Sequence, residues 1–367
     1  MNIDKLNTKP LTDEEVKKEI PSLFKSRIFQ AGFYKFVKKI SPSMSKDEFK
    51  DVVEQFKSVE SVEDVQWAAY RIAKKNIKDT IKHYEVKGIE KLNPENKYVF
   101  LSTHSNILGD PYYFGYSIMS SGFKPTRLGI GLNLTPMKIL KTIMKGQGCF
   151  LIPRSNENKK LFLENTKKIS ELVHNIYFED NKSIWLPNRN GRAKDNNHTT
   201  NKAIIKMLLY SFKERRMNLN DMINLYNITP VIISYEYNSS VINFAYEAEK
   251  KTLGKFQKLI QDAVTSYKGL ADNKGNVKII FGEPIKGEYA SIKDVAKSID
   301  EFIIPNYPLW NINRIAYGIK NNSDYSVMNE NEHQFLKQLN RMKNENIKNY
   351  IINYYAKPVE KKLEKIH

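Results

Sequence analysis

The sequence holds a single cysteine, Cys149, among its 367 residues. One thiol cannot form a disulfide within the chain, and a metal cluster built from several cysteines of one chain is excluded as well. Reducing compartments keep thiols free, so this cysteine usage is typical of a cytoplasmic protein. We therefore expect a cytoplasmic chain that folds without covalent cross-links.

Long apolar runs are missing too, because charged residues interrupt every stretch of about 18 residues. The first twenty residues, MNIDKLNTKPLTDEEVKKEI, lack the apolar segment of a secretory signal. Any contact with a membrane is therefore expected from one side, by a protein associated peripherally with the inner face of that membrane.

Acidic residues are in deficit, since 59 Lys and Arg against 41 Asp and Glu give a net charge of +18. Such a field attracts nucleic acids, anionic lipid surfaces or phosphorylated substrates, and charge alone does not choose among them. A basic nucleic-acid-binding protein is one alternative, and it predicts strongly salt-dependent binding. The sequence has no nucleic-acid-binding motif, however, so we expect no nucleic-acid partner.

Several chemical signatures are absent as well. The sequence has no Walker-type phosphate loop, no Gly-x-Gly-x-x-Gly fingerprint, no His-Glu-x-x-His and no Gly-x-Ser-x-Gly elbow. Five of the six histidines lack the spacing of paired metal ligands: His83, His174, His198, His333 and His367. We expect no metal and no resident cofactor.

The sequence divides into three regions. Residues 1–92 are predicted to be helical, beginning with Thr12 and Glu15 at capping-box spacing and continuing through a periodic segment at 62–85. Residues 93–290 alternate short apolar runs with amphipathic segments, and residues 291–367 return to helical patterns.

The middle region carries the signal for the fold class. Six apolar runs have the length of strands: 98–104, 126–131, 149–154, 183–188, 228–237 and 277–285. Segments of helical length separate the first five: 111–121, 135–146, 159–178 and 201–214. This alternation predicts an α/β fold, a mixed, mostly parallel sheet flanked by helices, with helical N- and C-terminal extensions.

Residues 26–40 form a second segment with the pattern of an amphipathic helix. Their apolar positions, Ile28, Phe29, Phe33, Phe36, Val37 and Ile40, recur at helical spacing among basic residues. Large apolar side chains with a basic rim suit the headgroup boundary of an anionic bilayer. Packing of the same stripe on the protein's own core is the alternative.

One loop combines the residue types needed for acid–base chemistry. The predicted strand 98–104 ends in His104, and Asp110 follows before Pro111. A carboxylate that holds one imidazole nitrogen orients the ring, so that the other nitrogen can take a proton from an attacking alcohol or amine. Asp before Pro is also an ordinary helix start. The pair alone therefore leaves a structural and a catalytic interpretation open.

The segment THSNILGDP and the blocks after it resemble the glycerolipid acyltransferase superfamily, which includes glycerol-3-phosphate and 1-acylglycerol-3-phosphate acyltransferases. In that family four residues separate the catalytic His and Asp, whereas five separate His104 from Asp110, as in a similar bacterial branch. The resemblance covers roughly residues 95–285. It implies that His104 is the general base and Asp110 its orienting partner.

Three further blocks follow in the family's order. GCFLIPRS places Arg154 where the family uses a basic side chain near the acceptor's phosphate. WLPNRNGRAKD matches the third block at Gly191 and Arg192, but Asn190 stands where the family has a glutamate. ITPVIISYEY, with Pro230, matches an apolar strand on the acyl-donor side. Taken singly, these residues are also compatible with surface charges, a turn glycine and an edge-strand proline.

The resemblance implies an acyltransferase of phospholipid synthesis at an anionic membrane surface. Its donor is acyl-CoA or acyl carrier protein, and its acceptor is glycerol 3-phosphate or lysophosphatidate, gripped at the phosphate by Arg154 and Arg192. Asn190 keeps hydrogen-bonding capacity but lacks the negative charge of glutamate. Acylation of a non-phosphate acceptor, an amino-lipid or a sugar, is therefore the alternative, and a weakened relative that acts as a lipid-surface scaffold is another.

Overall fold

The computed structural model describes residues 7–132, 138–153, 159–249 and 254–364. Its strands are β1 (His83–Lys87), β2 (Val99–Ser102), β3 (Arg127–Gly131), β4 (Cys149–Ile152), β5 (Ile184–Pro187), β6 (Ile228–Tyr235) and β7 (Asn276–Phe281). Within the described residues they form one sheet in the order β1-β7-β6-β2-β5-β3-β4. Only β6 and β7 pair antiparallel. The predicted mixed, mostly parallel α/β fold is confirmed, and all six predicted strands are present.

Helices precede, connect and follow these strands. The first half of the chain contains α1 (Asp13–Lys25), α2 (Arg27–Ile40), α3 (Lys46–Lys57), α4 (Val62–Thr80), the short 3₁₀ turn η2 (Ile89–Lys91), α5 (Gly109–Ser120), α6 (Lys138–Gly146) and α7 (Lys159–Phe178). The second half contains α8 (Lys202–Glu214), α9 (Leu219–Tyr226), α10 (Val241–Glu249), α11 (Lys255–Ala271), α12 (Ile292–Asn306), α13 (Asn311–Asn321), α14 (Glu330–Arg341) and α15 (Glu345–Leu363). The predicted capping box is present, since Glu15 N–H donates to Thr12 Oγ1 at 3.2 Å.

Strand β1 corrects the sequence-based assignment of residues 62–85 to one helix. Helix α4 ends at Thr80, and His83–Lys87 pairs with β7 in parallel. Lys82 N–H donates to Gly275 O at 2.7 Å just before the strand begins. The partner strand lies far along the chain, so helical periodicity could not reveal this pairing. The predicted helical region 1–92 therefore also contributes one strand to the sheet.

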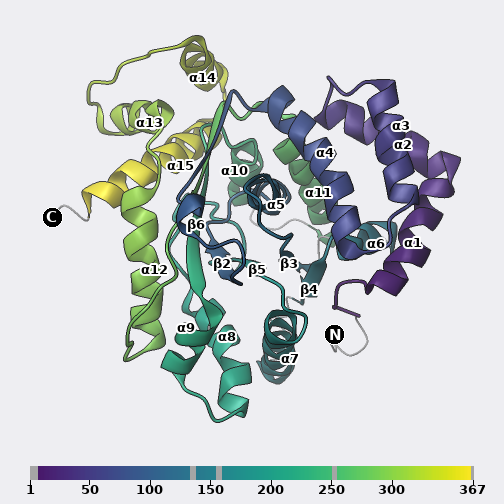
Figure 1. Ribbon diagram of the computed structural model, residues 1–367. Helices are drawn as coiled ribbons and strands as arrows, with labels where there is room; N and C mark the ends of the chain where they lie inside the picture. The colour runs from purple at the N-terminus through teal and green to yellow at the C-terminus, as the bar shows by residue number, and fades with distance from the viewer. Residues whose placement is uncertain (1–6, 133–137, 154–158, 250–253, 365–367) are drawn as a thin grey trace.

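Two hydrophobic clusters cover the two faces of the sheet. On one face, Phe100 and Trp185 pack with α5 and with the N-terminal helices α1 to α4. On the other face, Leu101 and Leu186 pack with α7, α8, α9 and α12. A third cluster joins α10 to α13, α14 and α15. Figure 1 shows α1 to α4 and α6 together on one side of the sheet, and α12 to α15 on the other.

Helix α2 turns most of its apolar stripe inward. Val37 and Ile40 are fully buried. Phe29 and Phe33 pack around Phe24, with ring centroids 5.0 and 5.2 Å away. Ile28 and Phe36 are the exceptions, because 88% and 38% of their surfaces are exposed. No described helix is both long and apolar enough to cross a bilayer.

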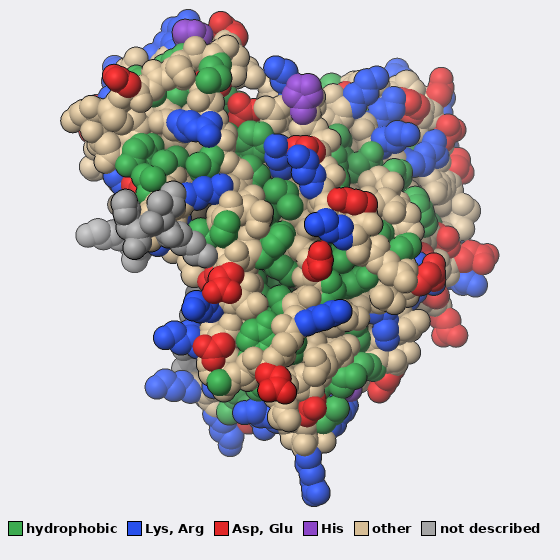
Figure 2. All heavy atoms as spheres, turned by 60° about the vertical axis from the view of Figure 1, so that its left-hand side comes forward, with side chains coloured by type: hydrophobic (Ala, Val, Ile, Leu, Met, Phe, Trp, Pro, Cys, Tyr) green, Lys and Arg blue, Asp and Glu red, His purple; other side chains and the backbone are tan. Residues whose placement is uncertain are grey.

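The net charge of +18 is not concentrated on the face that Figure 2 shows. Lysine and arginine side chains alternate there with aspartate and glutamate, around a central band of hydrophobic side chains. Nucleic-acid-binding proteins commonly gather basic residues on one face. This face lacks such a stripe, while the absence of a nucleic-acid partner stays a prediction.

Candidate active site

The loop that follows β2 is held on one side by strand β6 and on the other by the loop after β5. Strands β2, β5 and β6 run parallel, so their carboxyl ends meet at one edge of the sheet, where open α/β sheets place their sites. Thr103 Oγ1 donates to Ile233 O at 3.0 Å and accepts from Ile233 N–H at 2.8 Å. On the other side, His104 O accepts from Ala193 N–H at 2.6 Å. The backbone that carries His104 is therefore anchored.

Asp110 is fully buried in the first turn of α5 and accepts four hydrogen bonds. Its Oδ2 accepts from His104 Nδ1 at 2.8 Å and from the N–H groups of Ser105 and Asn106 at 2.7 and 2.9 Å. Its Oδ1 accepts from the Tyr235 hydroxyl at 2.7 Å. A carboxylate accepts on both oxygens, so it satisfies all four donors at once. The sequence-predicted pair is thus in direct contact.

The bond to Asp110 determines what His104 can do. With its Nδ1–H donating to the carboxylate, the ring carries its lone pair on Nε2, the atom needed for a general base. No described residue forms a hydrogen bond with Nε2. The ring also lies against Trp185, with centroids 6.3 Å apart in an edge-to-face arrangement. His104 is therefore oriented by contacts on one side, and it is largely buried, with 7% of its surface exposed.

Asn106 shapes the same loop, and sequence reasoning missed it. Its Oδ1 accepts from Gly109 N–H at 3.0 Å, which satisfies a donor at the start of α5. Its amide packs against Gly269, where an added Cβ would lie 2.3 Å from Asn106 Oδ1. Glycine at position 269 lets α11 approach the loop this closely. The only sequence signal was an asparagine two residues after His104.

Tyr235 is the second residue that the sequence did not single out. It ends β6 and is almost completely buried. Burial raises the pKa of its hydroxyl, and the neighbouring charge of Asp110 raises it further, so the hydroxyl remains a donor. Its signal was a polar ring at the carboxyl end of an apolar strand, inside the block ITPVIISYEY.

Arg192 lies beside this loop but is already paired. Its Nη2 lies 3.1 Å from Asp262 Oδ1 and 3.6 Å from Glu247 Oε1, and its guanidinium covers the ring of Phe244. Lys194 also forms an ion pair with Glu247. Two cations therefore face two carboxylates. Arg192 Nη1 is buried and has no hydrogen-bond partner among the described residues.

The remaining predicted site residues are placed differently. Gly191 has φ +84°, the left-handed region that favours glycine, and an added Cβ there would meet nothing within 4 Å. Asn190 is exposed in the same turn. Arg154 lies outside the described residues. Pro230 is buried inside β6, opposite Leu101 of β2, so it belongs to a central strand and not to the edge of the sheet. The substrate-binding roles of these residues stay predictions.

His198 is a second buried histidine near His104. Its Nε2 lies 2.9 Å from Asn196 Oδ1 and 3.1 Å from the Tyr307 hydroxyl. Burial lowers the pKa of His198 to about 3, and the nearby Arg189 and His104 lower it as well. The ring is therefore neutral at physiological pH. A cavity of about 10 Å³, with Ser105 and Tyr235 in its wall, lies nearby and has room for roughly one water molecule.

A large apolar cavity begins next to the His104 loop. Its volume is about 560 Å³, within the range of small-molecule sites. Leu108, Pro111 and Tyr112 line it at the start of α5, and helices α1, α2, α4 and α6 supply most of the other walls. Ile28 and Ile139 line the cavity and are exposed, so it opens to the surface between α2 and α6.

The sequence matches no protein-family model and no curated protein. Among solved structures, a 1-acyl-sn-glycerophosphate (LPA) acyltransferase, PlsC, from Thermotoga maritima aligns with 78% of this chain and 94% of its own, at 11% identity and a TM-score of 0.39. The cell division protein FtsY from Thermotoga maritima aligns with 74% of this chain and 87% of its own, at 11% identity and a TM-score of 0.24. Both likenesses are distant, and neither assigns a family or a reaction.

The hydrogen bond between Tyr235 and Asp110 predicts that substitutions of these two residues have coupled effects on the free energy of unfolding. Tyr235→Phe should lower the free energy of unfolding by about 1.5–3 kcal/mol, because a buried charged acceptor loses a donor. Urea unfolding of Tyr235→Phe, Asp110→Asn and the double variant should give a coupling energy of about 1–2 kcal/mol. Tyr177→Phe is the control, since its hydroxyl bonds to Lys97 O at 3.0 Å on the other face of the sheet. Additive effects of Tyr235→Phe and Asp110→Asn would contradict the coupling.

Proposed function

We propose that this protein transfers a fatty acyl group from a thioester to the hydroxyl of an acceptor, with His104 as the general base. The observation that carries the proposal is the contact between His104 and Asp110, in a segment whose Leu108 and Pro111 line an apolar cavity of about 560 Å³. A base alone fits many reactions. A base next to a cavity that suits an alkyl chain favours acyl transfer.

The chemistry requires no nucleophile from the protein. His104 Nε2 takes the proton of the acceptor hydroxyl as the oxygen attacks the thioester carbonyl, and the Asp110 carboxylate stabilises the imidazolium that forms. The tetrahedral intermediate then collapses, the carbon–sulfur bond breaks, and the imidazolium returns the proton to the departing thiolate. The products are an ester and a free thiol. Acyl-CoA and acyl carrier protein both supply such a thioester.

The chemical identity of the acceptor is the more specific part of the proposal. Resemblance to the glycerolipid acyltransferases favours glycerol 3-phosphate or lysophosphatidate in phospholipid synthesis. The ion pairs of Arg192 with Asp262 and Glu247 favour the second candidate, an acceptor without phosphate such as an amino-lipid or a sugar. A phosphate would have to compete with two carboxylates for this guanidinium.

The surface around the cavity mouth suits a membrane partner. Ile28 is 88% exposed and Phe36 is 38% exposed on α2, and both line the cavity. Arg27, Lys35 and Lys39 are exposed on the same helix. Each basic residue near an anionic bilayer contributes about 1 kcal/mol. We therefore include peripheral binding to the inner, anionic face of a cytoplasmic membrane in the proposal.

The reaction is tested with labelled acyl-CoA or acyl carrier protein and a panel of phosphate, amine and sugar acceptors. His104→Ala should lower kcat about a hundred- to ten-thousandfold, because general-base help is removed. His83→Ala, at an exposed histidine of β1, is the matched control and should leave the rate unchanged. The proposal fails if no acceptor is acylated, or if His104→Ala keeps the wild-type rate. Acylation of the amine or sugar acceptors alone would select the second candidate.

The cavity predicts a limit on acyl-chain length. Gly115 lines it on α5, and a Cβ added there would meet nothing within 4 Å. Gly115→Leu should therefore fold, fill part of the cavity and lower kcat/KM for long acyl donors about tenfold while sparing short ones, since each excluded CH₂ forfeits about 0.8 kcal/mol. Ala203→Leu, on the exposed face of α8, is the control. An unchanged chain-length profile would mean that the acyl chain lies elsewhere.

The exposed position of Ile28 predicts a membrane-binding defect. Ile28→Glu should weaken binding to vesicles containing phosphatidylglycerol at least about tenfold, because an Ile side chain contributes about 1.5–3 kcal/mol on burial. Co-sedimentation with vesicles measures this loss. Leu225→Glu, at an exposed leucine of α9, is the matched control and should bind like the wild type. Equal binding of the Ile28→Glu protein would rule out α2 as the docking helix.

A further inference from the structure

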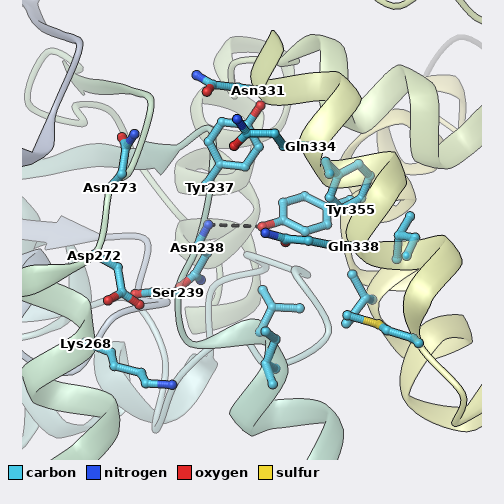
Figure 3. A pocket seen from close by; sticks show the side chains of 16 residues that line it. Tyr237, Asn238, Ser239, Lys268, Asp272, Asn273, Asn331, Gln334, Gln338 and Tyr355 are labelled. Carbon is cyan, nitrogen blue, oxygen red and sulfur yellow. Dashed lines mark hydrogen bonds between the residues drawn. The ribbon is translucent and has the colours of Figure 1, made fainter.

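A second cavity lies away from the apolar one, where the C-terminal helices meet the end of β6. Its volume is about 320 Å³, large enough for a small molecule. Figure 3 shows its walls, which come from residues 237–239, from the end of α11 and from helices α14 and α15. The acyl-transfer proposal assigns no role to this cavity.

The back wall of the cavity is held by hydrogen bonds. Asn238 N–H donates to the Tyr355 hydroxyl at 3.1 Å, and Asn238 Nδ2 donates to the Tyr354 hydroxyl at 2.7 Å. Asn238 Oδ1 accepts from Ser240 N–H at 3.0 Å. The backbone that links β6 to α10 is therefore tied to α15. A ligand would meet a surface that is already ordered, which lowers the entropic cost of binding.

Helix α14 presents a row of amides to the cavity. Asn331, Gln334 and Gln338 follow at spacings of three and four residues, so they share one face of the helix. In Figure 3 this face is turned toward the cavity, across from Asp272 and Asn273. None of the three amides forms a hydrogen bond with a described residue. Each therefore offers both donors and an acceptor to a ligand.

The opposite wall adds two opposite charges that do not pair with each other. Lys268 lies in the last turn of α11. Asp272 follows as the C-cap residue, and its backbone is extended and no longer helical. No described residue lies within ion-pair distance of either side chain. Burial raises the pKa of Asp272, and the Ser239 hydroxyl beside it in the cavity wall is buried with no hydrogen-bond partner among the described residues. Buried polar groups normally have partners, so this wall lacks hydrogen bonds that a ligand could supply.

The charge and the shape of the lining select a class of ligand. One lysine and one aspartate cancel, and the other polar groups are neutral, although the whole protein carries +18. The lining therefore has no excess of positive charge that would favour an anion such as phosphate. The apolar part of the lining, formed by Val241, Leu339, Met342 and other side chains, suits carbon–hydrogen faces. A sugar ring combines such faces with an edge of hydroxyls that both donate and accept.

We propose that this cavity binds a neutral sugar or cyclic polyol ring, held at its hydroxyls by the amides of α14 and by Asp272. The ring packs its carbon–hydrogen face on the apolar side chains of α10 and α14. This binding does not depend on acyl transfer, so it is tested separately from catalysis.

The test uses ligand-observed saturation-transfer NMR on the full-length protein, with methyl glucoside, methyl galactoside, methyl mannoside and myo-inositol as probes. At least one ring should bind, and inorganic phosphate should not compete with it. Gln334→Ala combined with Gln338→Ala should weaken binding about tenfold, because two hydrogen-bonding side chains are lost. Both glutamines are exposed, so their replacement leaves the core intact.

Lys337→Ala is the matched control, because it lies on the same helix, is exposed and is not part of the cavity wall. It should bind the ring like the wild type. The proposal is overturned if none of the four rings binds, if phosphate displaces the bound ring, or if the double variant binds as tightly as the control. Loss of acyl-transfer activity in any of these proteins has no bearing on this result.

Discussion

The site depends on one carboxylate that is buried and fully used. Asp110 joins three separate parts of the fold, since it accepts from the loop after β2, belongs to α5 and receives the hydroxyl that ends β6. A buried carboxylate is costly unless donors surround it, and four donors do so here. The imidazole of His104 is one of these donors, so the same hydrogen bonds also fix the orientation of its ring.

The N-terminal helices enclose an apolar space that reaches the His104 loop. Aromatic packing around Phe24 and Phe33 holds α1, α2 and α3 together, while the space between α2, α4, α5 and α6 stays open and apolar. Empty apolar space of this size costs dispersion energy. Leu108 and Pro111 bring this apolar space to the segment that carries His104 and Asp110, and the proposed alkyl ligand would fill it.

Arg192 is compensated by neighbouring carboxylates. Arg192 lies beside the His104 loop, and Asp262 and Glu247 already neutralise it. Both carboxylates come from helices α10 and α11, which follow the last matched block in the sequence. An arginine held in this way orders the loop of residues 188–193 and attracts anions weakly. The charge around Arg192 therefore depends on elements that the matched motifs do not include.

Local pattern determined the fold class, the six predicted strands, the capping box at Thr12 and the closeness of His104 to Asp110, because each depends on residues near one another in the chain. Only tertiary structure decided the rest. The pairing of β1 with β7, the bond from Tyr235 to Asp110 and the ion pairs of Arg192 join residues far apart in sequence. Such contacts leave no periodic signal, since their geometry arises only when the sheet and its helices pack.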